Sequence, residues 1–124
     1  HRGEQARIES ASLILKRIGD ISSKFPFVLT GDLNVREDSK AYGTLRAGSP
    51  TVRLADAKYA SANGHFGGDS TFSAFGKELQ PGNKIDYVFV REGIRVIEHG
   101  ALSDQWNGLW ASDHLPVLAE IEIK

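Results

Sequence analysis

The sequence contains no cysteine, and that absence alone excludes several kinds of site. Among its 124 residues no thiol is present to form a disulfide, to bind a metal as thiolate or to act as a nucleophile. A basic surplus is missing too, because 15 Lys and Arg stand against 16 Asp and Glu and give a formal net charge of -1. Proteins that coat nucleic acids generally carry such a surplus for their phosphate contacts. Tight non-specific nucleic-acid binding is therefore not expected, whereas chemistry on one phosphate group at a time stays open.

Long apolar runs are also missing from the sequence. No stretch approaches the roughly 18 apolar residues that a membrane-spanning helix needs, so no membrane span is predicted. No signal peptide is visible, and nothing in the composition assigns a cellular compartment. Hydrophobic residues nevertheless make up 40% of the chain and charged residues 25%. This length and composition predict one small folded domain with a core of its own.

The first segment, from Glu4 to Lys24, has the periodicity of an amphipathic helix. Apolar residues recur at spacings of three and four positions, and polar residues fill the opposite face. The apolar set comprises Ile8, Ala11, Ile14, Leu15, Ile18 and Ile21. Gly19 costs a helix about 1 kcal/mol relative to Ala, which predicts a weak point there. Pro26 follows the expected end of the helix.

Later segments have the composition of β-strands. The apolar run at 27–29 predicts a short strand buried on both faces. Residues 85–90 predict a second strand, which a hairpin-like connection at 91–93 joins to a third at 94–102. Residues 115–123 alternate as in a strand with one buried face. A short helix is expected at 39–47, with Asp38 or Ser39 as its cap and Gly48 after its end. The segment 54–59 is ambiguous, and 61–70 and 103–112 are expected to be exposed loops.

The expected strand at 85–90 is apolar on both of its faces. Ile85, Tyr87 and Phe89 point to one side, and Val88 and Val90 point to the other. One long helix cannot cover both faces of a sheet. The sequence therefore predicts part of a larger α/β (α+β) sandwich with a mostly antiparallel sheet. Its uncovered apolar face should make the isolated chain dimerise, swap or aggregate.

Polar residues occupy four places where an expected strand meets a loop. The segments are Gly31-Asp32-Leu33-Asn34, Thr71-Phe72, Ile85-Asp86-Tyr87 and Ser112-Asp113-His114-Leu115-Pro116. Asp and Asn beside Gly are common in turns, so a single segment of this kind is not specific. Asp86 differs, because a carboxylate in an apolar strand is costly unless it is paired, and His or Arg is its expected partner. Strands of one sheet can bring their ends to one edge, where carboxylate, amide and imidazole groups would suit a divalent cation and a phosphate.

The order of these segments resembles the signature of the endonuclease/exonuclease/phosphatase superfamily. The motifs are Gly-Asp-x-Asn, Thr-Phe, Ile-Asp-Tyr and Ser-Asp-His-x-Pro, and they match from Phe27 to the C-terminus. Residues 1–7 resemble the stretch that follows an Asn-Thr-His motif in that family. The resemblance implies that residues 1–124 are the C-terminal portion of a single domain, half of a four-layer α/β/β/α sandwich. It also implies that the N-terminal half, with a metal-binding Glu, an Asn and a His of the family site, lies outside this chain.

The resemblance further implies divalent-metal-dependent hydrolysis of a phosphate ester, with Mg²⁺ or Mn²⁺ as cofactor and water attacking in line with the leaving oxygen. Asp32 would orient or deprotonate that water, and Asn34 would contact a phosphate oxygen or the nucleophile. His114 would donate to a phosphate oxygen or act as acid or base, held in one tautomer by Asp86. Asp113 would bind the metal. The implied substrates are nucleic acid, a phosphoinositide or another phosphodiester.

Several residues near these motifs have ordinary structural interpretations. Trp106 and Trp110 could line a substrate pocket, Trp110 as a substrate-binding residue, although loop packing is favoured for both. Lys84 is expected to be a solvated surface residue rather than a phosphate contact. His65 and His99 have no metal-ligand spacing and are expected at the surface. A bracing, core or turn role is expected for Thr71, Phe72, Tyr87 and Ser112.

Two functions remain open at this point. The first is a metal-dependent phosphoesterase, and the second is a catalytically incomplete half-domain that acts only as a binding or interaction module. The absence of the family's Glu and His favours the second for the isolated chain. The presence of every motif residue favours an enzyme, because a binding module has no chemical reason to keep Asp32, Asn34, Asp86, Asp113 and His114.

Overall fold

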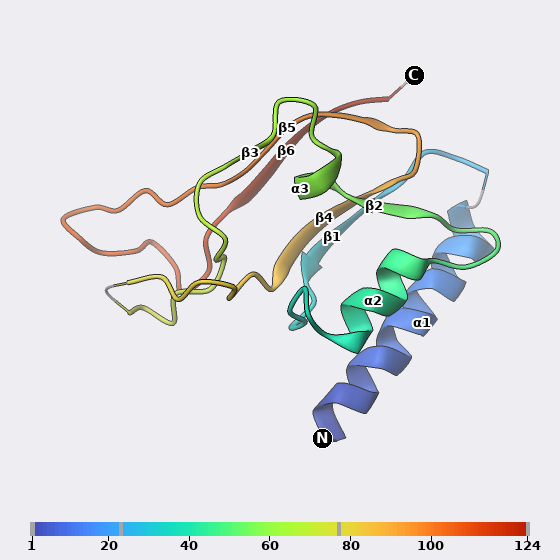
Figure 1. Ribbon diagram of the computed structural model, residues 1–124, viewed down its shortest axis with the longest axis horizontal. Helices are drawn as coiled ribbons and strands as arrows, with labels where there is room; N and C mark the ends of the chain where they lie inside the picture. The colour runs from blue at the N-terminus through green and yellow to red at the C-terminus, as the bar shows by residue number, and fades with distance from the viewer. Residues whose placement is uncertain (1, 23, 77, 124) are drawn as a thin grey trace.

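The computed structural model describes residues 2–22, 24–76 and 78–123 and arranges them in three layers (Figure 1). Two helices lie side by side on one face of a sheet with strand order β1-β4-β2, and a second sheet with order β3-β5-β6 lies on its other face. The helices are α1 (Arg2–Ser22) and α2 (Lys40–Ala47), and the short α3 (Ala57–Ala60) lies beside the second sheet. The strands are β1 (Val28–Asp32), β2 (Leu54–Asp56), β3 (His65–Phe66), β4 (Asp86–Arg91), β5 (Arg95–Ala101) and β6 (Val117–Glu122).

Helix α1 confirms the expected amphipathic helix, with its bounds moved slightly toward the N-terminus. Ala11 and Leu15 are fully buried and lead the stripe that packs on α2 and the first sheet. The helix continues through Gly19. A Cβ there would lie 3.0 Å from Thr51 Oγ1, so the glycine allows a close approach. Ile21 lies outside the buried stripe and is 75% exposed.

Helix α2 and the segment after it are set by their caps. The Ser39 hydroxyl accepts a hydrogen bond from Tyr42 N (3.2 Å), and Gly48 ends the helix at φ 70°, which confirms both expected ends. The ambiguous segment 54–59 divides into β2 and α3. Asp56 ends the strand and caps the helix, because its Oδ1 accepts from Lys58 N (3.0 Å).

Strand β4 lies at the centre of the first sheet and is buried on both faces, as expected. Tyr87 and Phe89 face the helices and join their core, whereas Val88 and Val90 face the second sheet. Tyr87 and Phe89 are 2% and 0% exposed. Because the two side-chain sets alternate along one strand, β4 connects both cores. The mixed α/β class with a long N-terminal helix is therefore confirmed.

Three expectations about the strands are wrong. Strands β4 and β5 do not form a hairpin, since β4 pairs with β1 and β2 whereas β5 pairs with β3 and β6. Strand β1 is not buried on both faces: among the described residues it pairs only with β4, and Val28 is 38% exposed. Within the expected loop at 61–70, His65 and Phe66 form the short parallel strand β3. Among the residues that the structure describes, no helix has the length and hydropathy to cross a bilayer.

Candidate active site

Asp32 and Asp86 are brought together by the pairing of β1 with β4. Asp32 ends β1 and Asp86 begins β4, and the antiparallel register places the two residues directly opposite each other. Leu33 N donates to Ile85 O (3.0 Å), which continues the pairing by one step beyond the strands. Two carboxylates from distant parts of the sequence therefore share one end of the first sheet.

His114 reaches this end from the other sheet. The residues before β6 run beside the Thr71-Phe72 segment, where Leu115 N donates to Thr71 O (2.7 Å) and Phe72 forms an isolated bridge with His114. The rings of Phe72 and His114 lie 5.0 Å apart between centroids. The expectation that strands of a single sheet bring the motifs together is therefore wrong. The site lies where the two sheets meet, because the strand after β4 crosses to the second sheet.

The contact between Asp86 and His114 fixes the orientation of the imidazole. His114 Nδ1 lies 3.0 Å from Asp86 Oδ2, and His114 Nε2 lies 3.9 Å from Asp32 Oδ2. The expected pairing of the strand carboxylate with a histidine is thus observed. The hydrogen bond to Asp86, with the negative charges of Asp86, Asp32 and Asp113, raises the pKa of His114 above its ordinary value. With Nδ1 donating to Asp86, Nε2 faces Asp32 across a gap too long for a direct hydrogen bond.

Asp32 and Asn34 form one local unit. Asp32 Oδ1 accepts from Asn34 N (2.8 Å), and Asp32 Oδ2 accepts from Asn34 Nδ2 (3.2 Å). Asn34 has a positive φ of 50°, a conformation that Asn tolerates better than most residues. The turn therefore holds the amide of Asn34 beside the carboxylate at the exposed edge of the site.

Thr71 and Ser112 support the site through backbone contacts, as expected. The residue Thr71 is 2% exposed. Its hydroxyl accepts hydrogen bonds from both Ile85 N (3.0 Å) and Asp86 N (3.1 Å). Ser112 Oγ accepts from His114 N (3.1 Å). The hydroxyl of Tyr87 also has the core partners that were expected, the carbonyls of Val35 (2.9 Å) and Lys84 (3.1 Å).

Asp113 and Trp110 lie close by in sequence but make different contacts. The carbonyl of Asp113 accepts from Ser73 N (2.7 Å), and its carboxylate accepts from Ser112 Oγ (3.3 Å). Trp110 Nε1 donates to Gly76 O (2.8 Å), which ties two loops together and fits the favoured loop-packing role. Trp106 is 84% exposed at the tip of its loop.

Three of these side chains form a compact group of possible metal ligands. One ligand atom each from Asp32, Asp86 and His114 lies within 4.8 Å of the others, and Asp113 is not part of this group within the described ranges. Carboxylate oxygens suit Mg²⁺, which takes one or two of them and keeps several waters. Imidazole is less suited to Mg²⁺ and is acceptable to Mn²⁺ and other transition metals. The carboxylates present therefore fit a partial shell for a hard divalent cation.

A family model described as the Endonuclease/Exonuclease/phosphatase family matches residues 5–114. The chain belongs to this family. At the level of the family, membership supports hydrolysis of phosphate esters. A search of curated proteins finds no significant match.

Solved structures of the endonuclease/exonuclease/phosphatase family have the same fold. A family member from Bacteroides vulgatus is 33% identical with a TM-score of 0.83, and the match covers 98% of this chain and 45% of that one. The mannosyl-6-phosphatase of Bacteroides thetaiotaomicron is 26% identical with a TM-score of 0.81, covering 96% and 46%. The human Nocturnin catalytic domain with a bound sulfate anion, at 21% identity and a TM-score of 0.69, covers 96% and 42% and shows a similar fold. The chain thus spans less than half of each structure.

A pocket of about 430 Å³ adjoins the family motifs on the side of Asn34. Phe72 and Asn83 line it together with two arginines, Arg7 and Arg36. Arg7 lies on α1 and Arg36 on the loop after β1, and both residues are exposed to solvent. Two of the motif residues, Asn34 and Phe72, therefore lie in its wall.

Two residues that were expected at the surface, Lys84 and His99, are buried, whereas His65 is partly exposed. Lys84 is 4% exposed and His99 0%, and His65 is half-buried against His99 with 2.9 Å between their Nδ1 atoms. The sequence did contain a signal for the burial of Lys84, because this residue precedes a strand that is buried on both faces. No sequence signal existed for His99, because a β-bulge between Val96 and Glu98 shifts the register of β5.

Proposed function

We propose that this chain forms part of the active site of a divalent-metal-dependent hydrolase of phosphate esters. The observation that carries the proposal is the convergence of Asp32, Asp86 and His114 where the two sheets meet. An imidazole oriented by one carboxylate and facing a second is suited to proton handling and to contact with an anionic group. Family membership supports the same reaction class.

In the proposed reaction a water oxygen attacks phosphorus while the ester P–O bond breaks. Asp32 orients that water and takes a proton from it, and the side-chain amide of Asn34 donates to a phosphate oxygen. The raised pKa of His114 favours the protonated ring, in which the Nε2–H group donates to another phosphate oxygen. Asp86 accepts from Nδ1 and thereby stabilises the protonated ring. The leaving oxygen takes up one proton, which balances the proton that Asp32 takes from the water, so the products are an alcohol and a phosphate.

A Mg²⁺ or Mn²⁺ ion would neutralise charge on the phosphoryl oxygens when bound. We propose Asp113 as its ligand from this chain, and the compact group of Asp32, Asp86 and His114, which does not include Asp113, as a neighbouring set of possible ligands. The family resemblance implies a further Glu ligand outside this chain. Binding of Mn²⁺ alone, measured by calorimetry with the wild type and an Asp113→Asn variant, tests this assignment without requiring activity.

A small phosphorylated compound is the substrate class that we propose. The formal net charge of -1 gives no basic surplus for binding along a nucleic acid. The similarity to a mannosyl-6-phosphatase supports a sugar phosphate as the first compound to assay. A phosphodiester and a phosphomonoester should be compared directly, because the motif residues suit either.

A second proposal concerns the partner of this chain. A groove of about 390 Å³ runs between α1 and β1 and is lined by apolar side chains, including Leu13, Ile18, Ile21 and Val28. Leu13 is 54% exposed and Ile21 75%, and β1 has one strand edge without a partner among the described residues. We propose that the N-terminal half of the domain covers this groove. The alternative function, an interaction module without activity, rests on the same groove.

Hydrolysis of p-nitrophenyl phosphate, bis-p-nitrophenyl phosphate and mannose 6-phosphate with Mg²⁺ or Mn²⁺ tests the enzyme proposal. The wild type should be compared with His114→Ala and with Asp20→Asn, a matched change in an exposed ion pair on α1. We expect EDTA to abolish the activity, His114→Ala to lower it about 100-fold or more, and Asp20→Asn to leave it unchanged. Hydrolysis that persists in His114→Ala would refute the proposed site. Hydrolysis that appears only after the N-terminal half is added would support the partner proposal.

A further inference from the structure

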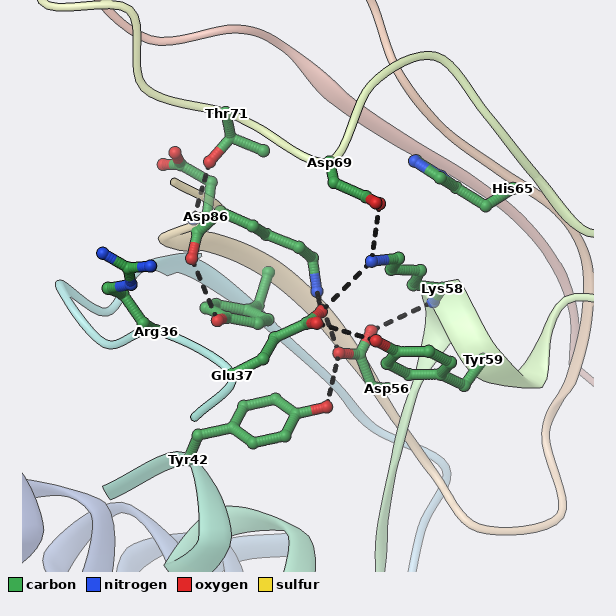
Figure 2. A network of polar contacts seen from close by, with 12 residues as sticks. Arg36, Glu37, Tyr42, Asp56, Lys58, Tyr59, His65, Asp69, Thr71 and Asp86 are labelled. Carbon is green, nitrogen blue, oxygen red and sulfur yellow. Dashed lines mark hydrogen bonds and ion pairs between the residues drawn. The ribbon is translucent and has the colours of Figure 1, made fainter. Parts of the chain in front are cut away.

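A buried ammonium group lies directly behind the candidate active site. Lys84 Nζ donates to Asp56 Oδ2 (2.9 Å) and to Glu37 Oε1 (3.1 Å), and it lies 3.9 Å from the centroid of the Tyr87 ring. The side chains of Lys84 and Asp56 are 5% and 0% exposed. Figure 2 shows the carboxylates of Asp56 and Glu37, which come from different segments, lying close together. A buried charge is tolerated only with partners of this kind.

The two carboxylates have further partners, so that the network has one well-defined arrangement. Asp56 Oδ2 also accepts from the hydroxyl of Tyr42 (3.0 Å), and Glu37 Oε2 accepts from that of Tyr59 (2.7 Å). Lys58 extends the network outward and lies 3.5 Å from Glu37 Oε1 and 2.8 Å from Asp69 Oδ1. A network in which each group is satisfied makes the surrounding backbone rigid.

The members of this network lie next to the site residues in sequence. Glu37 follows the turn of Asp32 and Asn34, Lys84 precedes Asp86, and Asp69 precedes Thr71. Those same three segments are joined at the site by hydrogen bonds that backbone N–H groups donate. Leu33 N donates to Ile85 O (3.0 Å), and Ile85 N and Asp86 N both donate to Thr71 Oγ1 (3.0 and 3.1 Å). The ion pairs therefore connect the same three segments that carry Asp32, Thr71 and Asp86.

We propose that Lys84 is a positioning residue for the hydrolysis, a role that rests on the proposed function. It touches neither Asp32 nor His114. It acts by holding the segment of Glu37 against its own segment, and this sets the separation between Asp32 and Asp86. Stability alone does not call for a charged group here, because a well-packed apolar pair often stabilises a core as much as a buried ion pair does.

The test is the double variant Lys84→Met/Asp56→Asn. It removes both members of the most buried pair and leaves no unpaired charge there, since Glu37 keeps Lys58 and Tyr59 as partners. Amide hydrogen exchange should be measured by NMR beside steady-state kinetics. The control is Lys16→Met, which removes an exposed lysine from an i,i+4 ion pair.

We expect the amides of Leu33, Ile85 and Asp86 to exchange about tenfold faster in the double variant, while those of Val88 and Val90 stay near their wild-type rates. We also expect kcat to fall about 10- to 100-fold with KM nearly unchanged, because the substrate still binds but the reacting groups are displaced. Lys16→Met should behave as the wild type in both measurements.

Wild-type exchange at the three amides in the double variant would overturn the positioning role whatever the activity. A uniform increase across all amides would overturn it as well, since that pattern reports only lower global stability. If the wild type hydrolyses no ester but the three amides respond as expected, the hydrolase proposal fails for this chain and the link between the segments stands. If the double variant does not fold, Glu37→Gln decides: faster exchange at Leu33 supports the link, and no change refutes it.

Discussion

Lowering the pH from about 8 to about 5 should weaken the fold by about 2 kcal/mol through a single buried imidazole, that of His99. His99 is 0% exposed on β5, and its Nδ1 lies 2.9 Å from Nδ1 of His65. His65 Nε2 lies 3.2 Å from the carbonyl of Gly68 and can only donate to it. His65 Nδ1 is then the acceptor and His99 Nδ1 the donor. This leaves His99 Nε2 as an unprotonated buried atom, and no described residue offers it a hydrogen bond.

The size of the effect follows from the cost of charging that ring. Burial, followed by the electrostatic effect of neighbours that include His65, Lys84 and Lys58, lowers the pKa of His99 from 6.5 to about 4. The unfolded chain therefore binds more protons than the folded chain between these values. The free energy of unfolding is highest above pH 6.5 and falls as the pH drops toward about 4. The full shift corresponds to about 3 kcal/mol, of which about 2 kcal/mol is lost by pH 5.

Urea unfolding followed by circular dichroism of the helices measures this effect. Wild type should be compared with His99→Asn, which keeps a donor near the position of Nδ1 but does not titrate. The comparison cancels the other titrating groups, including His114, whose raised pKa contributes with the opposite sign. The wild type should lose about 2 kcal/mol more than the variant between pH 8 and pH 5. An equal loss in both proteins would refute the assignment of a buried neutral imidazole.

Three further outcomes are expected. Gly67→Ala should destabilise the fold by at least about 2 kcal/mol in thermal unfolding, because φ is 86° and a Cβ would lie 2.1 Å from a carbonyl oxygen of β5. The control is Gly68→Ala, where a Cβ meets nothing within 4 Å. It should cost less than about 0.5 kcal/mol. Asp86→Asn should lower the pKa of His114 in an NMR titration, since the hydrogen bond to a charged oxygen is lost, and an unchanged titration would contradict the pairing. The wild-type chain should self-associate in sedimentation velocity and Leu13→Glu should do so less; a wild type that stays monomeric would argue against an uncovered apolar groove.

The sequence predicted the partner of Asp86 better than it predicted how the motif segments are brought together. The motif at Asp86 required a partner because a lone carboxylate in an apolar strand is costly, and His114 is that partner. The expected single-sheet edge was wrong because alternation within β4 and β5 cannot tell whether neighbouring strands pair with each other. That choice depends on tertiary packing, here the pairing of β4 with β1 and β2.

Buried polar residues were the hardest to predict. Lys84 was expected in solvent because lysine is rarely buried, and its two carboxylate partners come from segments that no local pattern connects to it. His99 was expected at the surface because it has no metal-ligand spacing. The bulge between Val96 and Glu98 shifts the register before His99, and a bulge of one residue leaves no periodic signal.

The position of the site between two sheets has a consequence for folding kinetics. Helices α1 and α2 depend mainly on local hydrogen bonds, whereas the pair of Asp86 and His114 joins residues 28 positions apart and requires both sheets to be in place. Non-local contacts form late because chain closure must come first. During refolding from urea, helical circular dichroism should therefore recover before the imidazole of His114 meets its carboxylate, so that secondary structure returns ahead of a competent site.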